Sequence, residues 1–405
     1  MAVTKNIESG TTKKGKSKRK VRIMKAIFIP SIISMFIGLL NLNHIGPWLE
    51  TPFTKAPYLS WTGDPKTTMT ICWETPLPTT GVIEYGKSSS YGNKIVMDEV
   101  GNVTFLHVVT LTNLEPNTTY HYRVYSTSYF TPYFLFDRTF KTAPNDTRPF
   151  SFAVYGDTRP DAFGITAHQT IVNEILALNP DFVLNVGDIV MTSNRLDQYD
   201  RFFYEIQYLA GTRPYMISIG NHEAYEHGGN ILPYLYYLNY PEEPANEFWY
   251  SFDYSNARFI SLFVGRNNQL LTPDQLDWLE EELNESKYNQ DIDWTFVYFH
   301  VPVLSSGESP SFLQIQLMPI FTKYQVDFVL AGHHHHYERL YIPNTHHIIA
   351  GGGGAELEIF LTKTPFTISS KITHCFSHFI VENRTVFYQC IDTQGNIIDW
   401  LVVSK

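Results

Sequence analysis

Five short apolar runs dominate the hydrophobic pattern between residues 150 and 331. They are rich in Val, Ile, Phe and Tyr, contain no Pro, and cover residues 150–155, 182–186, 215–219, 294–299 and 326–331. Continuous apolar stretches of this length are typical of strands that are buried on both faces of a sheet. The pattern therefore predicts five buried strands.

Helical patterns lie between these runs. Leucines at helical spacing begin at Leu276, and Thr272 and Gln275 before them are typical of a capping box with Pro273 at the first helical position. A second helix is predicted over 165–178. Strands that alternate with helices in this way indicate an α/β domain.

The chain has a different pattern before residue 145. Short alternating stretches such as 68–73 and 119–125 are separated by turn residues such as Gly63-Asp64-Pro65. This is typical of a small all-β sandwich, which we place at 55–144. A turn-rich junction follows it, and the α/β domain is predicted over 145–405.

The N-terminal segment combines positive charge with an apolar stretch. Residues 1–25 hold nine Lys or Arg against one Glu, and residues 26–42 are almost uncharged. We predict a basic cytoplasmic tail at 1–25, a membrane anchor or signal segment at 26–42 and a linker at 43–54. We favour an uncleaved anchor, which by the positive-inside rule puts the body of the chain, residues 55–405, outside the cytoplasm, at the cell membrane. The whole chain carries a net charge of −10, so its body is acidic, which argues against nucleic acid binding.

Polar side chains follow each of the five apolar runs. Asp157, Asp188 and Asn221 follow the first three, and His300 and His333 follow the last two. Because ligands bind beyond the carboxyl ends of strands in open α/β sheets, these side chains should converge. Their oxygen and nitrogen atoms suit borderline divalent metals, and one carboxylate can bridge two ions about 3.5–4 Å apart. Any one of them alone would more often be structural, but the ordered set predicts a two-metal hydrolase site.

These motifs resemble those of the calcineurin-type metallophosphoesterases. Gly220-Asn221-His222-Glu223 and Gly332-His333-x-His335-x-Tyr337-Glu338-Arg339 are similar to the purple acid phosphatase branch. Pro57-Tyr58-Leu59 and Tyr85-Gly86 resemble the fibronectin-III-like domain that precedes those enzymes. The resemblance covers about residues 55–405. It implies an α/β fold, a β-sandwich flanked by helices, and phosphoester hydrolysis by a dinuclear metal site.

The resemblance also implies a role for each site residue. The implied ligands are Asp157 and His335 for the first metal, Asp188 for both metals, and Asn221, His300 and His333 for the second. His222 would be the acid that contacts the substrate, and it would not bind metal.

The chain departs from the family pattern at two positions. Met191 stands where purple acid phosphatases have the tyrosine that binds ferric iron, so we predict divalent metals and no purple colour. Arg159 stands where other metallophosphoesterases have a histidine ligand. Since arginine is always charged and only donates, we expect it to reach substrate phosphate. The first metal would then rely on its remaining ligands and water, or on help from His168.

The predicted activity is phosphomonoester hydrolysis with two divalent ions such as Fe, Mn or Zn. A water that the metals activate would attack phosphorus, Arg159 would help to hold the non-bridging oxygens, and His222 would protonate the leaving oxygen. The Tyr-rich insertion at 224–247 is predicted to form a wall or lid of the site. A phosphodiesterase of the same fold and a non-catalytic surface-binding protein with a structural metal site remain alternatives.

Overall fold

The computed structural model describes residues 54–97, 104–127, 132–134, 137–161, 163–226, 229–242, 247–264, 270–307, 311–360 and 362–405. The tail and anchor predicted at 1–25 and 26–42 lie outside these residues, as does nearly all of the linker at 43–54. In the part of the chain that the structure describes, no helix has both the length and the apolar character needed to span a membrane.

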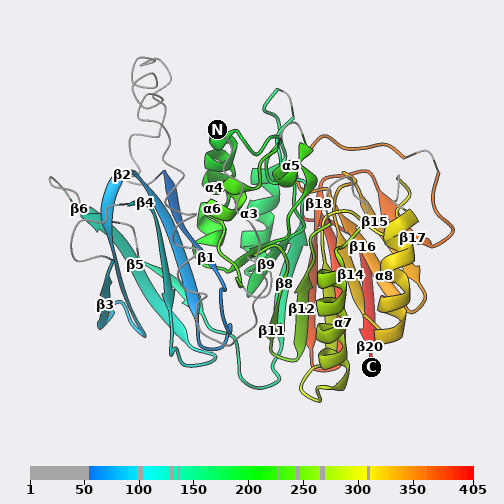
Figure 1. Ribbon diagram of the computed structural model, residues 1–405, viewed down its shortest axis with the longest axis horizontal. Coiled ribbons are helices and arrows are strands. Elements are labelled where there is room, and N and C mark those ends of the chain that lie inside the picture. The colour runs from blue at the N-terminus through cyan, green and yellow to red at the C-terminus, as the bar shows by residue number, and fades with distance from the viewer. Residues whose placement is uncertain are drawn as a thin grey trace, which may run out of the picture. The chain divides into compact units, whose positions relative to one another are not determined.

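Seven strands form the front sandwich, which is drawn in blue and cyan in Figure 1. They are β1 (Lys55–Ser60), β2 (Met69–Gly86), β3 (Asn93–Val96), β4 (Thr104–Leu111), β5 (Thr119–Thr127), β6 (Pro132–Phe134) and β7 (Arg138–Lys141). The long strand β2 belongs to both layers, because its first part pairs with β1 and β4 and its second part pairs with β3 and β5. The pairing of β2 with β4 shifts register between Glu74 and Thr79, where the strand passes from one layer to the other.

Two further sheets make up the larger sandwich. The first has the order β10-β9-β8-β18-β19-β20, and the second has the order β11-β12-β13-β14-β16-β15-β17. Strands of the first sheet are β8 (Phe150–Tyr155), β9 (Phe182–Asn185), β10 (Tyr215–Ile217), β18 (Cys375–Glu382), β19 (Thr385–Asp392) and β20 (Ile397–Ser404). Those of the second are β11 (Tyr250–Tyr254), β12 (Ala257–Ser261), β13 (Trp294–Tyr298), β14 (Phe328–Ala331), β15 (Tyr337–Ile342), β16 (Thr345–Ala350) and β17 (Thr367–Lys371).

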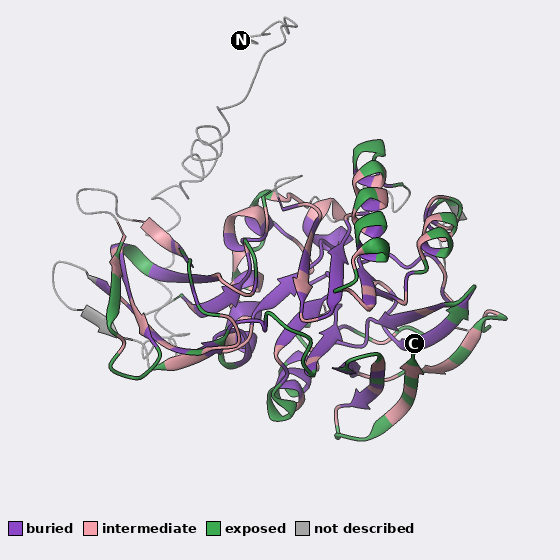
Figure 2. Ribbon diagram, turned by 90° about the horizontal axis from the view of Figure 1, so that it is seen from below, coloured by how far each residue is buried: buried purple, intermediate pink, exposed green. Residues whose placement is uncertain are grey.

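Aromatic side chains fill the space between these two sheets. Phe152 of β8 stacks on Phe182 with ring centroids 5.2 Å apart, and it meets Phe259 and Phe296 of the second sheet edge-on at 5.1 and 5.2 Å. Stacked and edge-to-face pairs are the arrangements that aromatic quadrupoles favour, and each ring buries a large apolar area. Figure 2 shows the strands around this layer as buried. The aromatic layer therefore fixes the two sheets face to face.

The described residues form six helices. They are α3 (His168–Leu178), α4 (Leu196–Ala210), α5 (Asn221–Ala224), α6 (Leu232–Tyr237), α7 (Pro273–Tyr288) and α8 (Ser311–Tyr324). Helix α3 packs on α4 and β18, whereas α7 packs on α8 and β12 (Figure 1). The predicted fold class, an α/β sandwich flanked by helices and preceded by a small all-β domain, is confirmed.

Helix α7 begins as the sequence predicts, but with half of the expected capping box. Thr272 Oγ1 accepts a hydrogen bond from the Gln275 amide at 3.3 Å, and Pro273 is the first helical residue. The Gln275 side chain does not return to the cap. It bonds both the amide and the carbonyl of Phe263, at 2.8 and 2.9 Å, and so ties the start of the preceding loop to the helix.

Part of the insertion at 224–247, which the sequence predicts to be a wall or lid of the site, packs between the front sandwich and strand β10. The Tyr58 hydroxyl donates to the carbonyl of Tyr237, and Ser60 Oγ donates to the carbonyl of Asn239 at 2.7 Å. Tyr234 and Tyr237 of α6 are buried. The Tyr-rich sequence explains this packing, because each tyrosine ring buries a large apolar face while its hydroxyl makes a hydrogen bond.

Candidate metal centre

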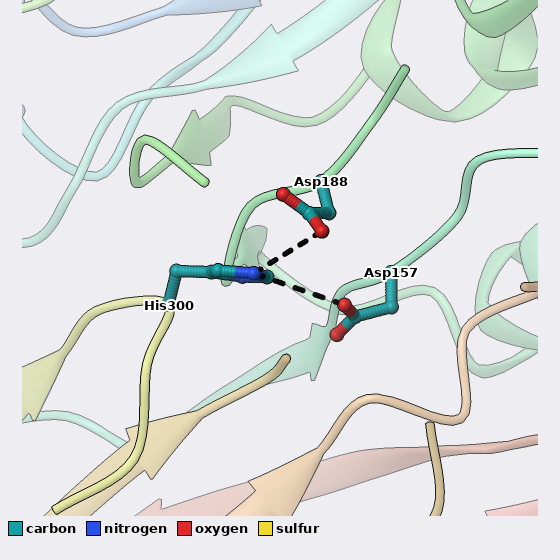
Figure 3. Close-up of side chains that lie close together, drawn as sticks. All are labelled: Asp157, Asp188 and His300. Carbon is teal, nitrogen blue, oxygen red and sulfur yellow. Dashed lines mark ion pairs between the residues drawn. The ribbon is translucent and has the colours of Figure 1, made fainter. Parts of the chain in front are cut away.

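The five predicted motifs meet at one edge of the sandwich. Strands β8, β9 and β10 run parallel in one sheet, and β13 and β14 run parallel in the other. The loops that follow them bring together atoms of Asp157, Asp188 and His300 that all lie within 4.8 Å of one another. Figure 3 shows these three side chains pointing toward one another from separate loops. The predicted convergence of the motifs is therefore observed.

The loops hold unusual backbone conformations. Asp157, Asp188 and His333 have φ angles of 56°, 57° and 71°, a left-handed region that non-glycine residues seldom adopt. Such strain persists only where the surroundings fix it, and it is concentrated at functional sites.

Two glycines leave room for the carboxylates. A Cβ atom on Gly220 would lie 2.2 Å from Asp188 Oδ1, and one on Gly332 would lie 2.4 Å from Asp157 Oδ2. Since both distances are far below van der Waals contact, larger residues at these two positions would displace the Asp188 and Asp157 carboxylates.

Four side chains form what we call the second ligand set: Asp188, Asn221, His300 and His333. His300 Nε2 lies 3.2 Å from Asp188 Oδ2 and 3.3 Å from His333 Nδ1, which in turn lies 3.0 Å from Asn221 Oδ1. Ligands about 2.0–2.1 Å from a tetrahedral zinc ion would be about 3.3 Å apart. The spacing of these four atoms therefore fits a first-row divalent cation.

Three side chains form the first ligand set: Asp157, Asp188 and His335. His335 Nε2 lies 3.5 Å from Asp157 Oδ1. This carboxylate oxygen is buried and has no hydrogen-bond partner among the described residues. A buried carboxylate oxygen without a donor is costly, and a cation would compensate it. The first set therefore also fits a cation, but with three protein ligands in place of four.

The histidines of both sets are held in defined tautomers. His300 Nδ1 donates to the carbonyl of Val186 at 2.8 Å, and His335 Nδ1 donates to that of Glu356 at 2.7 Å. In the neutral ring, each Nε2 therefore presents a lone pair to the site, which is the usual arrangement of metal-binding histidines.

The electrostatics of the site favour positive charge. Burial lowers the pKa of His300, but Asp188 and Asp157 outweigh it and raise the pKa to about 9. Burial and the neighbouring His300 lower the pKa of His333 to about 4. Burial raises the pKa of Asp188, but His300, His222 and Arg159 together bring it well below its usual range. The Asp188 carboxylate is thus arranged to be ionised among buried imidazoles, as a metal site requires.

Glu223 holds the Asp188 loop, a role for which the sequence motifs gave no prediction. Its carboxylate accepts from the amides of Asp188, Ile189 and Gly220 at 2.9 Å each, and from Val190 at 3.3 Å. Burial, followed by the charge of Asp188, raises the pKa of Glu223 to about 7. Its place in the Gly220–Glu223 motif was the available signal, but a motif does not reveal which amides a buried glutamate will meet.

His222 is placed beside the ligands. Its Nδ1 donates to the Met191 carbonyl at 2.7 Å, and its Nε2 lies 3.6 Å from Asp188 Oδ2. Burial lowers the pKa of this imidazole. The side chain thus presents Nε2 toward the edge of the metal centre, and its contact with substrate stays a prediction.

Arg159 and Met191 lie together at the first ligand set. Arg159 Nη1 donates to Met191 Sδ at 3.4 Å, and Arg159 Nη2 lies 3.4 Å from His335 Nε2. His168, which was considered as an additional ligand, is engaged elsewhere. Its Nδ1 is 2.6 Å from Glu205 Oε2 and its Nε2 is 3.1 Å from the Tyr155 hydroxyl, so both ring nitrogens already have partners.

Comparison with known families agrees with this geometry. Residues 150–337 match the calcineurin-like phosphoesterase domain, and residues 54–142 match the purple acid phosphatase N-terminal domain. The chain therefore carries a calcineurin-like phosphoesterase domain preceded by a purple acid phosphatase N-terminal domain.

Individual relatives are distant. An uncharacterised protein of Mycobacterium tuberculosis is 27% identical over 73% of this chain and 65% of its own length. The Fe(3+)-Zn(2+) purple acid phosphatase 12 of Arabidopsis thaliana is 27% identical over 65% of this chain and 60% of its own length. The chain thus spans less than two thirds of the length of these relatives. Among solved structures, purple acid phosphatase PPD1 from yellow lupin matches with a TM-score of 0.73 and 21% identity, covering 86% of this chain and 74% of the lupin chain.

Proposed function

We propose that this protein is a metal-dependent phosphomonoester hydrolase. The observation that carries the proposal is the second ligand set, in which four ligand atoms lie 3.0–3.3 Å from their neighbours, beside a histidine that is not one of them. Divalent ions such as Fe, Mn or Zn bound to the two sets would hold phosphoryl oxygens and lower the pKa of a water, from 15.7 to about 7 in the best case.

The chain's own residues supply the rest of the chemistry. His222, fixed through Nδ1 by the Met191 carbonyl, can deliver a proton from Nε2 to the leaving oxygen. Arg159 can bond a non-bridging oxygen, since a guanidinium presents several donors in a plane. Its charge also supports a monoester over a diester, because a monoester carries one more negative charge near neutral pH.

Leaving-group dependence tests the role of His222. We expect His222→Ala to retain bound metal and to lower kcat by about 10²–10⁴-fold for an alkyl phosphate, which needs protonation of its leaving oxygen. The loss should be much smaller for 4-nitrophenyl phosphate, whose leaving group is a weak base. His121→Ala, in the front sandwich, is the control and should behave as wild type.

Equal losses for both substrates would contradict the acid role of His222. Faster hydrolysis of bis(4-nitrophenyl) phosphate than of 4-nitrophenyl phosphate would instead support the phosphodiesterase alternative. Full metal content with no turnover of either ester would support a binding protein with a structural metal site.

We also propose that the catalytic domain lies outside the cytoplasm, at the cell membrane. The support is the basic segment 1–25 followed by the apolar segment 26–42. Protease added to intact cells should digest a C-terminal tag on the full chain. A tag that is digested only after lysis would contradict this placement.

A further inference from the structure

Arg159 lies across the first ligand set. Its Nη2 is 3.4 Å from His335 Nε2, and its Nε is 3.8 Å from Asp188 Oδ2. Because His335 Nδ1 donates to the Glu356 carbonyl, Nε2 holds the lone pair that a cation would use. The guanidinium therefore engages the atom that the first cation needs.

The surrounding chain fixes the guanidinium in this place. Arg159 Nη1 donates to Met191 Sδ, and the Arg159 amide donates to the Asp188 carbonyl at 3.3 Å. The side chain is 14% exposed, so it is largely shielded from solvent. Met191 thus supports the arginine, and its neutral thioether would bring no negative charge to a cation at the first ligand set.

Among the residues that the structure describes, Arg159 approaches the second ligand set only at the shared Asp188 carboxylate, at 3.8 Å, and at none of its nitrogen ligands. His300 Nδ1 and the Val186 carbonyl are paired, and the Nε2 atom of His300 faces Asp188 and His333. A cation there would meet four protein ligands without displacing an arginine. At the first set it would meet three, and it would have to move a positive charge away from His335.

We propose that Arg159 makes the two cation positions unequal, so that the second set retains its ion while the first set binds an ion only when metal is supplied in excess. This inference rests on the proposed metal-dependent function. The first ion should bind at least about tenfold more weakly than the second, which corresponds to about 1.4 kcal/mol. Repulsion between the guanidinium and a divalent ion a few ångströms away acts in the same direction.

Metal retention tests the proposal directly. Each protein is stripped, loaded with excess Zn²⁺, dialysed against metal-free buffer and subjected to elemental analysis. We expect wild type to retain one ion per chain and Arg159→His, which offers a neutral imidazole in place of the guanidinium, to retain two. Arg159→Lys keeps the charge and should retain one. Arg195→His is the matched control, since Arg195 is exposed and pairs with Asp197, and it should retain one.

Two results would overturn the proposal: retention of two ions by wild type, or retention of only one by Arg159→His. If Arg159→His fails to fold, titration of stripped wild type with Zn²⁺ by calorimetry decides the matter. Two binding phases with affinities at least about tenfold apart support the proposal, and two equal phases overturn it.

Failure of the proposed function gives a different result. Absence of turnover with one retained ion in wild type and two in Arg159→His would contradict the hydrolase and leave the inequality of the two positions intact. Normal turnover with two equally retained ions would support the hydrolase and contradict the inequality of the two positions.

Discussion

The front sandwich and the metal centre both bury polar and charged side chains, but they treat them differently. In the front sandwich, Lys55 Nζ is 2.5 Å from Glu74 and 2.5 Å from Asp200, which belongs to helix α4. In the metal centre, Asp157 Oδ1 has no hydrogen-bond partner among the described residues, and ring nitrogens of His300 and His333 face each other.

A buried polar cluster indicates a ligand when its atoms lack partners within the protein. Lys55 has two carboxylate partners within the protein, and a buried charge with a structural role requires such partners. In the metal centre, acceptor atoms converge, and the described residues supply too few hydrogen-bond donors for them. Burial alone lowers the pKa of His107 to about 4, whereas the carboxylates raise that of His300 to about 9. Neighbouring negative charge therefore distinguishes His300 from the structural His107, whereas His333, the other histidine of the second ligand set, has its pKa lowered to about 4 by burial and by His300.

The largest expected effect comes from Asp188→Asn. Asp188 belongs to both ligand sets, so the neutral amide weakens cation binding at each of them. We expect loss of at least one ion in elemental analysis and a fall in kcat/KM of about 10³-fold or more, since one interaction of this kind can be worth several kcal/mol. Asp146→Asn, at an exposed pair with Arg148, should keep the metal and the activity. Full activity of Asp188→Asn would show that the site is assigned incorrectly.

Lys55→Met should destabilise the front sandwich. It leaves the Glu74 and Asp200 carboxylates without their shared cation, and removing one partner of a buried ion pair costs about 3–5 kcal/mol. We expect this loss in the free energy of unfolding from urea titration, with metal retention unchanged. Lys87→Met, at an exposed pair with Glu115, should leave the free energy of unfolding nearly unchanged. A similar cost for both variants would mean that burial of Lys55 has no special weight.

His107→Gln should give the smallest effect, which appears only in acid. Because the folded pKa is about 4 and the unfolded value is near 6.5, the unfolded chain takes up a proton that the folded chain refuses. Stability is therefore full above about pH 6.5 and falls as the pH drops toward 4, by up to about 3 kcal/mol from this residue. Urea unfolding of His107→Gln at pH 7, 6, 5 and 4.5 should show a shallower decline than wild type. His121→Gln, whose ring is partly exposed beside Asp137, is the control. Equal slopes for wild type and His107→Gln would remove His107 as a cause.

The sequence was most informative where one local pattern determines the outcome. Buried strands such as Phe150–Tyr155 were predicted from continuous apolar runs, and the structure has that strand with the same bounds. The convergence of Asp157, Asp188 and His300 followed from the rule that loops after parallel strands meet at one edge.

Partners set by tertiary packing could not be predicted. Gln275 bonds Phe263 rather than the helix cap, and His168 pairs with Glu205 rather than approaching the metal centre. Both choices depend on which loop or helix packs alongside. The position of the Arg159 guanidinium is of the same kind: the sequence indicates a donor near the site, and only the fold places it against His335.

The front sandwich and the larger sandwich share one hydrophobic core. Trp61 packs on Phe182 and Phe252 with ring centroids 5.5 and 5.2 Å apart, and Leu59 of β1 forms a bridge with Pro214 beside β10. The phosphoesterase domain therefore cannot be separated from the front sandwich without exposing part of its core. A chain cut at the junction near residue 145 would expose aromatic surface beside strand β10, which leads to Asn221. Truncation would therefore reduce solubility and also disturb the loop that carries Asn221.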